Sequence, residues 1–123
     1  MPTAPDTGLL CLVAIARFHQ LPVDAAQLAH EFGTGFDDMT LQRAASAVGL
    51  QCRPVETLHA AALPAIARHR DGSYFILARH NGDQYLVHDL RDEQPRVISE
   101  QEFLQRWTGE LLLFAKRARV MDQ

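Results

Sequence analysis

The chain has 123 residues, of which 47% are apolar and 22% are charged, a balance that predicts a single folded, soluble domain with one hydrophobic core. Its net charge of −3 provides no basic face of the kind that nucleic-acid-binding domains carry. The apolar runs at 9–16 and 111–115 are too short to span a bilayer, and residues 1–7 lack the basic start and unbroken apolar stretch of a signal peptide.

A first helix is predicted from Gly8 to Phe18. Apolar residues occupy nearly every side of its helical wheel, namely Leu9, Leu10, Leu12, Val13, Ile15 and Phe18. A helix that is hydrophobic all round is usually buried on all sides. We therefore expect this helix in the core, with Asp6 or Thr7 capping its N-terminus and Pro22 breaking the chain after it.

Two further helices are predicted in the first half of the chain. The sequence Asp24-Ala25-Ala26-Gln27 is typical of a capping box that begins a second helix, and Gly33 is its expected end. After an acidic loop at 33–38, apolar residues recur at helical spacing, at Leu41, Ala44, Ala45 and Val48. Gly49 is expected to end this third helix.

The second half of the chain has the pattern of an antiparallel sheet. Four short apolar segments bounded by turn residues are typical of strands, namely Leu63–Ala67, Ser73–Ala78, Gln84–His88 and Leu111–Ala115. The dipeptides Asp71-Gly72 and Asn81-Gly82 lie between the first three of them, and both indicate hairpin turns.

A fourth helix is predicted before the last strand. A second capping box at Ser99–Glu102 begins it, it runs toward Trp107, and Gly109 is its expected end. Helices followed by an antiparallel sheet define the α+β class, with the N-terminal helices packed on the sheet.

Three positions on this frame have the arrangement of a cysteine peptidase site. Thr7 lies at the start of the first helix, Tyr74 on a strand, and Asp89 at the end of the next strand. In such a peptidase, a helix N-terminus and a strand histidine lower the pKa of a thiol, and an acid orients the histidine.

On these residues the chain resembles the papain-like peptidase domain at the N-terminus of bacterial ABC exporters, which trims double-glycine leaders from bacteriocins. The family motifs correspond to Asp6–Leu12, Gly72–Phe75 and His88-Asp89, and the segment Arg17–Val23 adds to the resemblance. The resemblance covers about residues 5–115 and implies a papain-like fold.

Two departures from the family pattern argue against peptidase activity. Thr7 stands where the family has its nucleophilic cysteine, and Tyr74 stands where it has its histidine, so that only Asp89 matches. Residues 1–4 also lack the glutamine that stabilises the oxyanion in the family. A threonine hydroxyl needs a base, and tyrosine is no useful base near neutral pH. We therefore predict a domain that is not an enzyme; the alternative is a leader peptidase with an unorthodox nucleophile.

The chain is also similar to the degenerate peptidase-like domain of exporters for repeats-in-toxin proteins, the haemolysin and cyclolysin type. The matching segments are Phe75–Leu77, Asp89-Leu90 and Pro95–Val97. This resemblance implies a non-catalytic receptor on the cytosolic side of the bacterial inner membrane, which holds the unfolded secreted protein for export. Its partners would be that cargo and the membrane and nucleotide-binding domains of the same exporter, with no nucleic acid. A free-standing regulatory domain is the third hypothesis.

The candidate binding residues are Thr7, Tyr74, Asp89 and Arg68. We expect Thr7 to be a helix cap and Asp89 a turn or capping residue. Tyr74 either packs across the vacated site in a cation–π contact with Arg68 or is an exposed aromatic on its strand.

The remaining chemistry-bearing residues are expected to be structural. Cys11 is predicted to be a small buried hydrophobe, and Trp107 to lie in the core rather than in a peptide-binding patch. With Cys52, Cys11 forms neither a CxxC pair nor a disulfide framework, which favours a reducing compartment. The spacing of the six histidines matches no zinc pattern, so no metal or cofactor is predicted.

The domain is predicted to span residues 1–123, with a core at about 5–116. Residues 117–123 are expected to be a tail or a linker toward a membrane domain. The basic segment Lys116–Arg119 is either a solvated tail or the cytosolic edge of a following membrane segment, where positive charge collects.

Overall fold

The computed structural model describes residues 6–58 and 63–116 of the chain. Within these residues the chain forms four helices and six strands. In chain order they are α1 (Thr7–Phe18), α2 (Ala25–Phe32), α3 (Asp38–Val48), β1 (Leu50–Val55), β2 (Ala65–His69), β3 (Tyr74–Asn81), β4 (Gln84–His88), β5 (Arg96–Ser99), α4 (Glu100–Arg106) and β6 (Trp107–Lys116). The predicted α+β class, with N-terminal helices and an antiparallel sheet, is confirmed.

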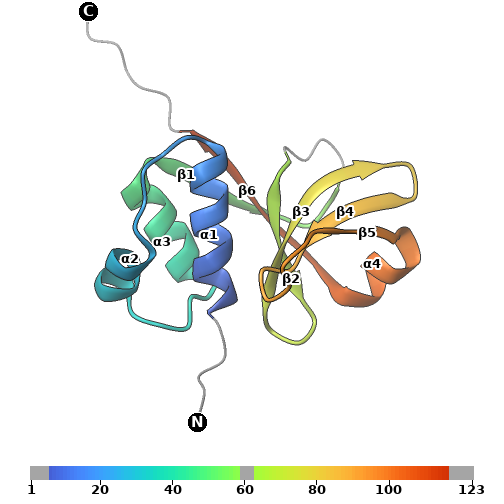
Figure 1. Ribbon diagram of the computed structural model, residues 1–123, viewed down its shortest axis with the longest axis horizontal. Helices are drawn as coiled ribbons and strands as arrows, with labels where there is room; N and C mark the ends of the chain where they lie inside the picture. The colour runs from blue at the N-terminus through green and yellow to red at the C-terminus, as the bar shows by residue number, and fades with distance from the viewer. Residues whose placement is uncertain (1–5, 59–62, 117–123) are drawn as a thin grey trace, which may run out of the picture.

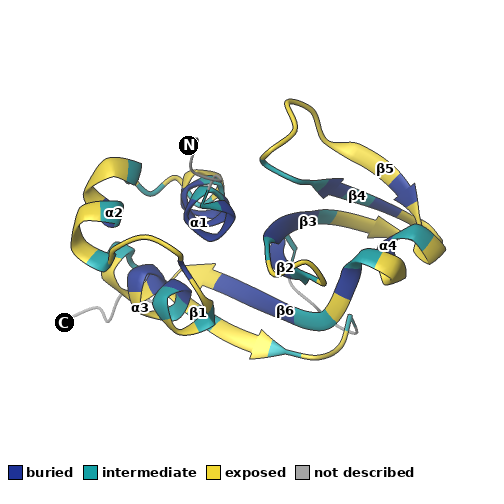
Figure 2. Cartoon of the chain, turned by 90° about the horizontal axis from the view of Figure 1, so that it is seen from below, coloured by how far each residue is buried: buried dark blue, intermediate teal, exposed yellow. Residues whose placement is uncertain are grey.

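The six strands form one antiparallel sheet in the order β1-β6-β2-β3-β4-β5. The long strand β6 pairs with β1 along its second half and with β2 along its first half, so it connects the helical part of the molecule to the sheet (Figure 1). Helices α1 and α4 lie on opposite sides of the strands (Figure 2). Each side of the sheet therefore has its own hydrophobic cluster.

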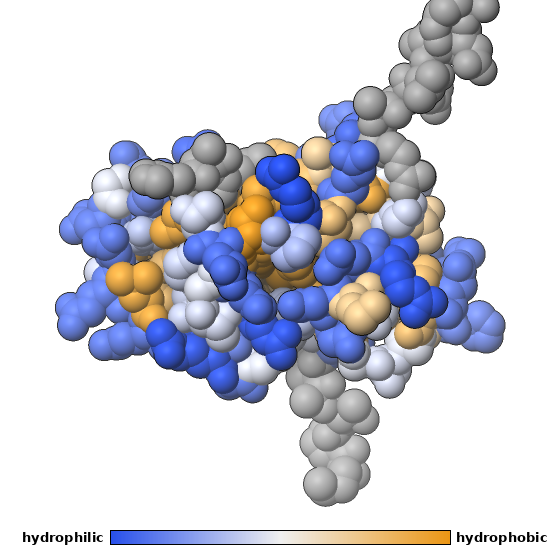
Figure 3. Space-filling model, turned by 180° about the vertical axis from the view of Figure 1, so that it is seen from behind, coloured by the Kyte–Doolittle hydropathy of each residue, from blue (hydrophilic) through white to orange (hydrophobic). Residues whose placement is uncertain are grey.

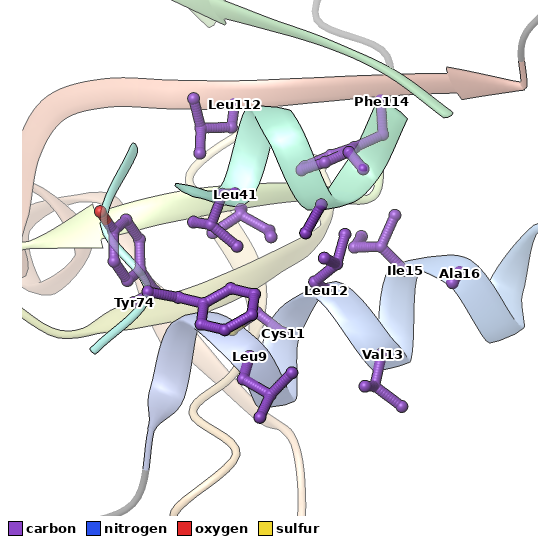
Figure 4. Packing of buried hydrophobic residues seen from close by; sticks show 14 of the residues in the cluster. Leu9, Cys11, Leu12, Val13, Ile15, Ala16, Leu41, Tyr74, Leu112 and Phe114 are labelled. Atoms are coloured by element: carbon purple, nitrogen blue, oxygen red, sulfur yellow. The ribbon is translucent and has the colours of Figure 1, made fainter. Parts of the chain in front are cut away.

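Helix α1 is the centre of the larger cluster, as its sequence predicts. Eight of its residues are buried, and they pack against Leu41 of α3, Tyr74 of β3, and Leu112 and Phe114 of β6 (Figure 4). The expectation of burial on every side is wrong at the last residue of the helix, because 61% of the surface of Phe18 is exposed.

The smaller cluster lies on the other side of the sheet, under α4. Phe103 of α4 stacks on Tyr85 of β4 with ring centroids 4.5 Å apart, and Trp107 lies 5.1 Å from Phe103. Trp107 is therefore a core residue, as predicted. Its indole N–H donates to the carbonyl oxygen of Glu110 at 2.7 Å.

Both predicted hairpins are present, and each turns at a glycine with a positive φ. Gly72 (φ 93°) lies in the turn between β2 and β3, and Gly82 (φ 62°) lies in the turn between β3 and β4. The prediction for β4 matches its bounds. The segment predicted for β2 begins and ends two residues early, the one for β3 ends three residues early, and the one for β6 is too short at both ends. The hairpin between β2 and β3 carries Tyr74, one of the predicted site residues.

Two strands were not predicted, and one helix end was predicted wrongly. Strands β1 and β5 are the edges of the sheet. Helix α4 ends at Arg106 rather than near Gly109, because Trp107 already has extended backbone angles (φ −89°, ψ 136°). Gly109 (φ 108°) lies instead within β6, where the pairing register with β2 shifts, as in a β-bulge.

Candidate functional site

An open cavity of about 850 Å³ lies where the N-terminus of α1 meets the hairpin between β2 and β3. The loop before α3 forms its other wall. Of the predicted site residues, Thr7, Tyr74 and Arg68 line this cavity. Asp89 is not among the lining residues, but Arg91, to which Asp89 is bound, is one of them.

Thr7 is buried, and its hydroxyl has a different role from the one predicted. Asp6 is the N-cap of α1, and Thr7 is the first residue of the helix, so the prediction of Thr7 as the cap is wrong. The Thr7 Oγ1 instead accepts a hydrogen bond from the backbone N–H of Tyr74 at 3.0 Å. This bond fastens the start of α1 to β3 across the floor of the cavity. None of the described residues that line the cavity is a histidine that would activate the hydroxyl.

Asp6 organises the loop that forms the second wall of the cavity. Its carboxylate accepts hydrogen bonds from the backbone N–H of Leu9 at 3.3 Å, of Gly35 at 2.9 Å and of Phe36 at 3.2 Å. One side chain thus caps α1 and holds the loop against it. Sequence reasoning recognised Asp6 only as a possible cap, because its loop partners lie about thirty residues away in the chain.

The loop and the helix touch at Gly8. A Cβ atom at Gly8 would lie 2.8 Å from the carbonyl oxygen of Phe36 and 2.9 Å from its Cβ, closer than real Cβ contacts. Gly8 therefore permits the close approach of α1 to the wall of the cavity.

Tyr74 lies at the base of the cavity, where both its ring and its hydroxyl have partners. Only 3% of its surface is exposed, so the alternative of an exposed strand aromatic is wrong. The Arg68 guanidinium carbon lies 5.6 Å from the centroid of the Tyr74 ring, which is the predicted cation–π contact. The Tyr74 hydroxyl donates to Asp38 Oδ1, which also pairs with Arg68 at 3.2 Å. Figure 4 shows this hydroxyl pointing away from the apolar side chains of α1.

The surroundings of Tyr74 keep its hydroxyl protonated. Burial raises the pKa of Tyr74 above its ordinary value, and the hydrogen bond to the Asp38 carboxylate raises it further. A phenol with a raised pKa, already donating its proton to a carboxylate, cannot serve as a general base near neutral pH.

Asp89 is held by an arginine in the turn after β4. Its two carboxylate oxygens accept from Arg91 Nε at 2.9 Å and Arg91 Nη2 at 2.6 Å, and its carbonyl oxygen accepts from the backbone N–H of Asp92 at 2.8 Å. Hydrogen bonds from Arg91 hold the pKa of Asp89 below its ordinary value. Asp89 therefore has the predicted turn role, and its charge is directed at Arg91.

Cys11 offers no substitute nucleophile. Its side chain has no exposed surface, and burial raises the pKa of its thiol far above the ordinary value. The thiolate, which is the reactive form, is therefore absent at neutral pH. Cys11 is the buried small hydrophobe that the sequence predicts.

A second cavity of about 510 Å³ adjoins the first at Arg68, and sequence reasoning did not predict it. Arg68 lines both cavities, and Asp38, Glu56 and Glu110 lie on the wall of the second. No group of three His, Cys, Asp or Glu side chains within the described residues is arranged to hold a metal ion. No helix in residues 6–58 or 63–116 is long and apolar enough to cross a membrane.

The chain is similar in sequence to a known family and to known proteins. The model of the Peptidase C39 family matches residues 3–119. The cyclolysin secretion/processing ATP-binding protein CyaB of Bordetella pertussis is 45% identical over 120 residues, which cover 92% of this chain and 17% of CyaB. The toxin RTX-I translocation ATP-binding protein of Actinobacillus pleuropneumoniae is 33% identical over 127 residues, which cover 96% of this chain and 18% of that protein. The chain thus spans less than a fifth of the length of these relatives.

Two solved structures share the fold. The N-terminal peptidase C39-like domain of the toxin secretion ATP-binding protein from Vibrio parahaemolyticus superimposes with a TM-score of 0.78 at 24% identity, covering 94% of this chain and all of that one (100%). A double-glycine-motif protease from an AMS/PCAT transporter, solved in complex with the leader peptide, has a TM-score of 0.84 at 19% identity and covers 96% of this chain and 89% of that one.

Proposed function

The chain belongs to the Peptidase C39 family, and from this premise we propose that it is a non-catalytic receptor domain of a type I secretion ABC exporter. The domain lies on the cytoplasmic side of the bacterial inner membrane and binds an unfolded repeats-in-toxin protein before export. The names of the similar proteins from Bordetella pertussis and Actinobacillus pleuropneumoniae, which concern cyclolysin secretion and RTX-I translocation, support this choice of cargo.

The main support for the proposal is that the side chains at all three peptidase positions, Thr7, Tyr74 and Asp89, are already hydrogen-bonded within the domain. The Thr7 hydroxyl accepts from a backbone N–H, and the Tyr74 hydroxyl donates to Asp38. Both oxygens of Asp89 accept from Arg91. None of these three positions therefore offers a free nucleophile or a general base, which supports binding rather than hydrolysis.

The cavity suits weak binding of an extended chain. Thr7, Tyr74 and Arg68 are its candidate contact residues, and Asp89 acts on the cavity through Arg91. An unfolded segment loses conformational freedom when it binds, so the affinity is modest. Modest affinity fits a receptor that must release its cargo to a transport channel.

The test is an NMR titration of the isotope-labelled chain with the calcium-binding repeat region of cyclolysin, without calcium (unfolded) and with it (folded). We expect amide shifts that cluster around Thr7 and Tyr74 and appear only with the unfolded form. Arg68→Gln is expected to weaken these shifts, and Arg79→Gln, an exposed arginine of β3, is the matched control.

Absence of shifts with either form would refute the receptor function. Shifts elsewhere would keep the function and move the site. The apolar area in the centre of the rear face is then the alternative surface (Figure 3).

The competing function is a leader peptidase with an unorthodox nucleophile, which the family name favours. The discriminating assay is incubation of the chain with a double-glycine leader peptide, followed by mass spectrometry. We expect the peptide to remain intact. Cleavage that is abolished by Thr7→Ala would establish the peptidase and refute the non-catalytic site.

A further inference from the structure

The end of α1 and the end of β6 form one surface, made of Arg17, Phe18, His19 and Lys116, which we term the exit surface. Figure 1 shows the two ends side by side. Lys116 pairs with Leu50 at the start of β1, and the preceding Gly49 faces Leu21, which follows α1. Partial burial, and then the charge of Lys116, lower the pKa of His19.

The exit surface presents an aromatic ring to solvent. Phe18 is 61% exposed, and its ring stands perpendicular to the ring of His19, with the centroids 5.3 Å apart. The chain turns directly after the helix. Gln20 has a left-handed conformation (φ 61°), and the N–H of Leu21 donates to the carbonyl of Ala16 at 2.9 Å. The turn packs Leu21 against the core, whereas Phe18 stays exposed.

The exit surface is also positively charged, against the net charge of −3 of the whole chain. Arg17 and Lys116 are both exposed, and neither forms an ion pair with a carboxylate of residues 6–58 or 63–116. Asp24 is the first carboxylate after α1 in the chain, and it caps α2 by accepting from the N–H of Ala26. Arg117 and Arg119 follow in the sequence and lie outside the described residues.

We propose that the exit surface rests on anionic lipid headgroups, with Phe18 at the headgroup level and Arg17 and Lys116 against the lipid phosphates. An aromatic ring beside basic residues is the combination that binds such an interface, through partial apolar burial and electrostatic attraction. The inference rests on the proposed function, because the chain after Lys116 must then lead toward the membrane domain of the exporter.

This placement orients the cargo cavity. The cavity lies at the N-terminus of α1 and the exit surface at its C-terminus. A helix of 12 residues is about 18 Å long at 1.5 Å per residue. The cavity therefore opens on the side of the domain away from the bilayer, where an unfolded chain arrives from the cytosol.

The test is co-sedimentation of the 123-residue chain with two kinds of vesicle, one of phosphatidylcholine alone and one that also contains phosphatidylglycerol. We expect binding to the anionic vesicles only, and loss of that binding at high salt because the attraction is screened. Phe18→Ser and the pair Arg17→Gln, Lys116→Gln are each expected to reduce the bound fraction by about fivefold.

Matched controls are Leu104→Ser, which removes an exposed apolar residue of α4, and the pair Arg79→Gln, Arg96→Gln in β3 and β5. Both controls should bind like the parent chain. Equal loss in the Leu104→Ser control, equal binding to both kinds of vesicle, or no binding would overturn the proposal. Loss with Arg117→Gln, Arg119→Gln and none with the exit-surface variants would overturn it as well.

Failure of this proposal is distinguishable from failure of the receptor function. Phe18→Ser leaves the cavity intact, so in the absence of vesicles its titration with the cyclolysin repeat region should match that of the parent chain. Vesicle binding without cargo shifts would refute the receptor function alone.

Discussion

Removing the hydroxyl of Thr7 should destabilise the domain, because the hydroxyl is the hydrogen-bond partner of a buried backbone group. Thr7 is 7% exposed and Tyr74 is 3% exposed, and the Oγ1 of Thr7 accepts from the N–H of Tyr74 at 3.0 Å. Thr7→Val keeps the branched shape and a similar helix propensity, but leaves this N–H without an acceptor. An unsatisfied buried donor costs about 1–3 kcal/mol.

The measurement is urea unfolding followed by circular dichroism, analysed as a two-state transition. We expect Thr7→Val to lower the free energy of unfolding by about 1–3 kcal/mol, a large part of the stability of a small domain. Thr7→Ser keeps the acceptor and removes one methyl group, so its cost should be smaller, about 1 kcal/mol.

The matched control is Thr108→Val in β6. Its Oγ1 also accepts from a backbone N–H, that of Glu110 at 3.3 Å, but the residue is exposed and water replaces the bond. We expect its effect to stay within about 0.5 kcal/mol. A Thr7→Val domain as stable as the Thr108→Val control would refute the argument that the threonine fastens α1 to β3.

Three further predictions concern Gly8, Asp6 and Asp89. Gly8→Ala should destabilise the domain by about 1–3 kcal/mol in urea unfolding, because the new methyl group would overlap the backbone of Phe36; an unchanged midpoint would contradict this. Asp6→Ala should speed hydrogen exchange of the Phe36 amide, which loses its acceptor, and unchanged exchange would show that the loop is held otherwise. Asp89→Asn should make the free energy of unfolding depend less on pH in the acid range. Because Arg91 lowers the folded-state pKa of Asp89 from its ordinary 3.8, the pair contributes stability above about pH 4 that is lost as the pH falls through the folded-state pKa. Parallel stability–pH curves for parent and variant would contradict it.

Local signals in the sequence were enough to predict most of the fold. The apolar density of α1, the capping residues of α2 and the glycine turns at Gly72 and Gly82 each act within a few residues. Strand β1 gave no such signal, because Arg53 and Pro54 interrupt its apolar pattern. Its strand conformation comes from pairing with β6, which lies about sixty residues later in the chain, a distance that follows from Leu50 pairing with Lys116.

The contrast between local signals and contacts of distant segments also applies to the site. Proximity of Thr7, Tyr74 and Arg68 followed from the topology and the family resemblance. The partners of these residues did not, because Asp38 lies 36 residues from Tyr74 in the chain and has no motif that marks it. The roles of Asp6 and Asp38 became visible only when the loop and α3 were placed against the hairpin.

These partners supply the physical argument for a binding domain. Hydrolysis needs polar groups that are held in place and still free to exchange protons with a substrate. At the three peptidase positions the hydroxyl of Thr7, the hydroxyl of Tyr74 and the carboxylate of Asp89 are each bound within the domain. Among the described residues, no buried side-chain nitrogen or oxygen lacks a hydrogen-bond partner. A satisfied polar network stabilises and rigidifies a surface, which is the physical basis of the proposed recognition of an unfolded chain.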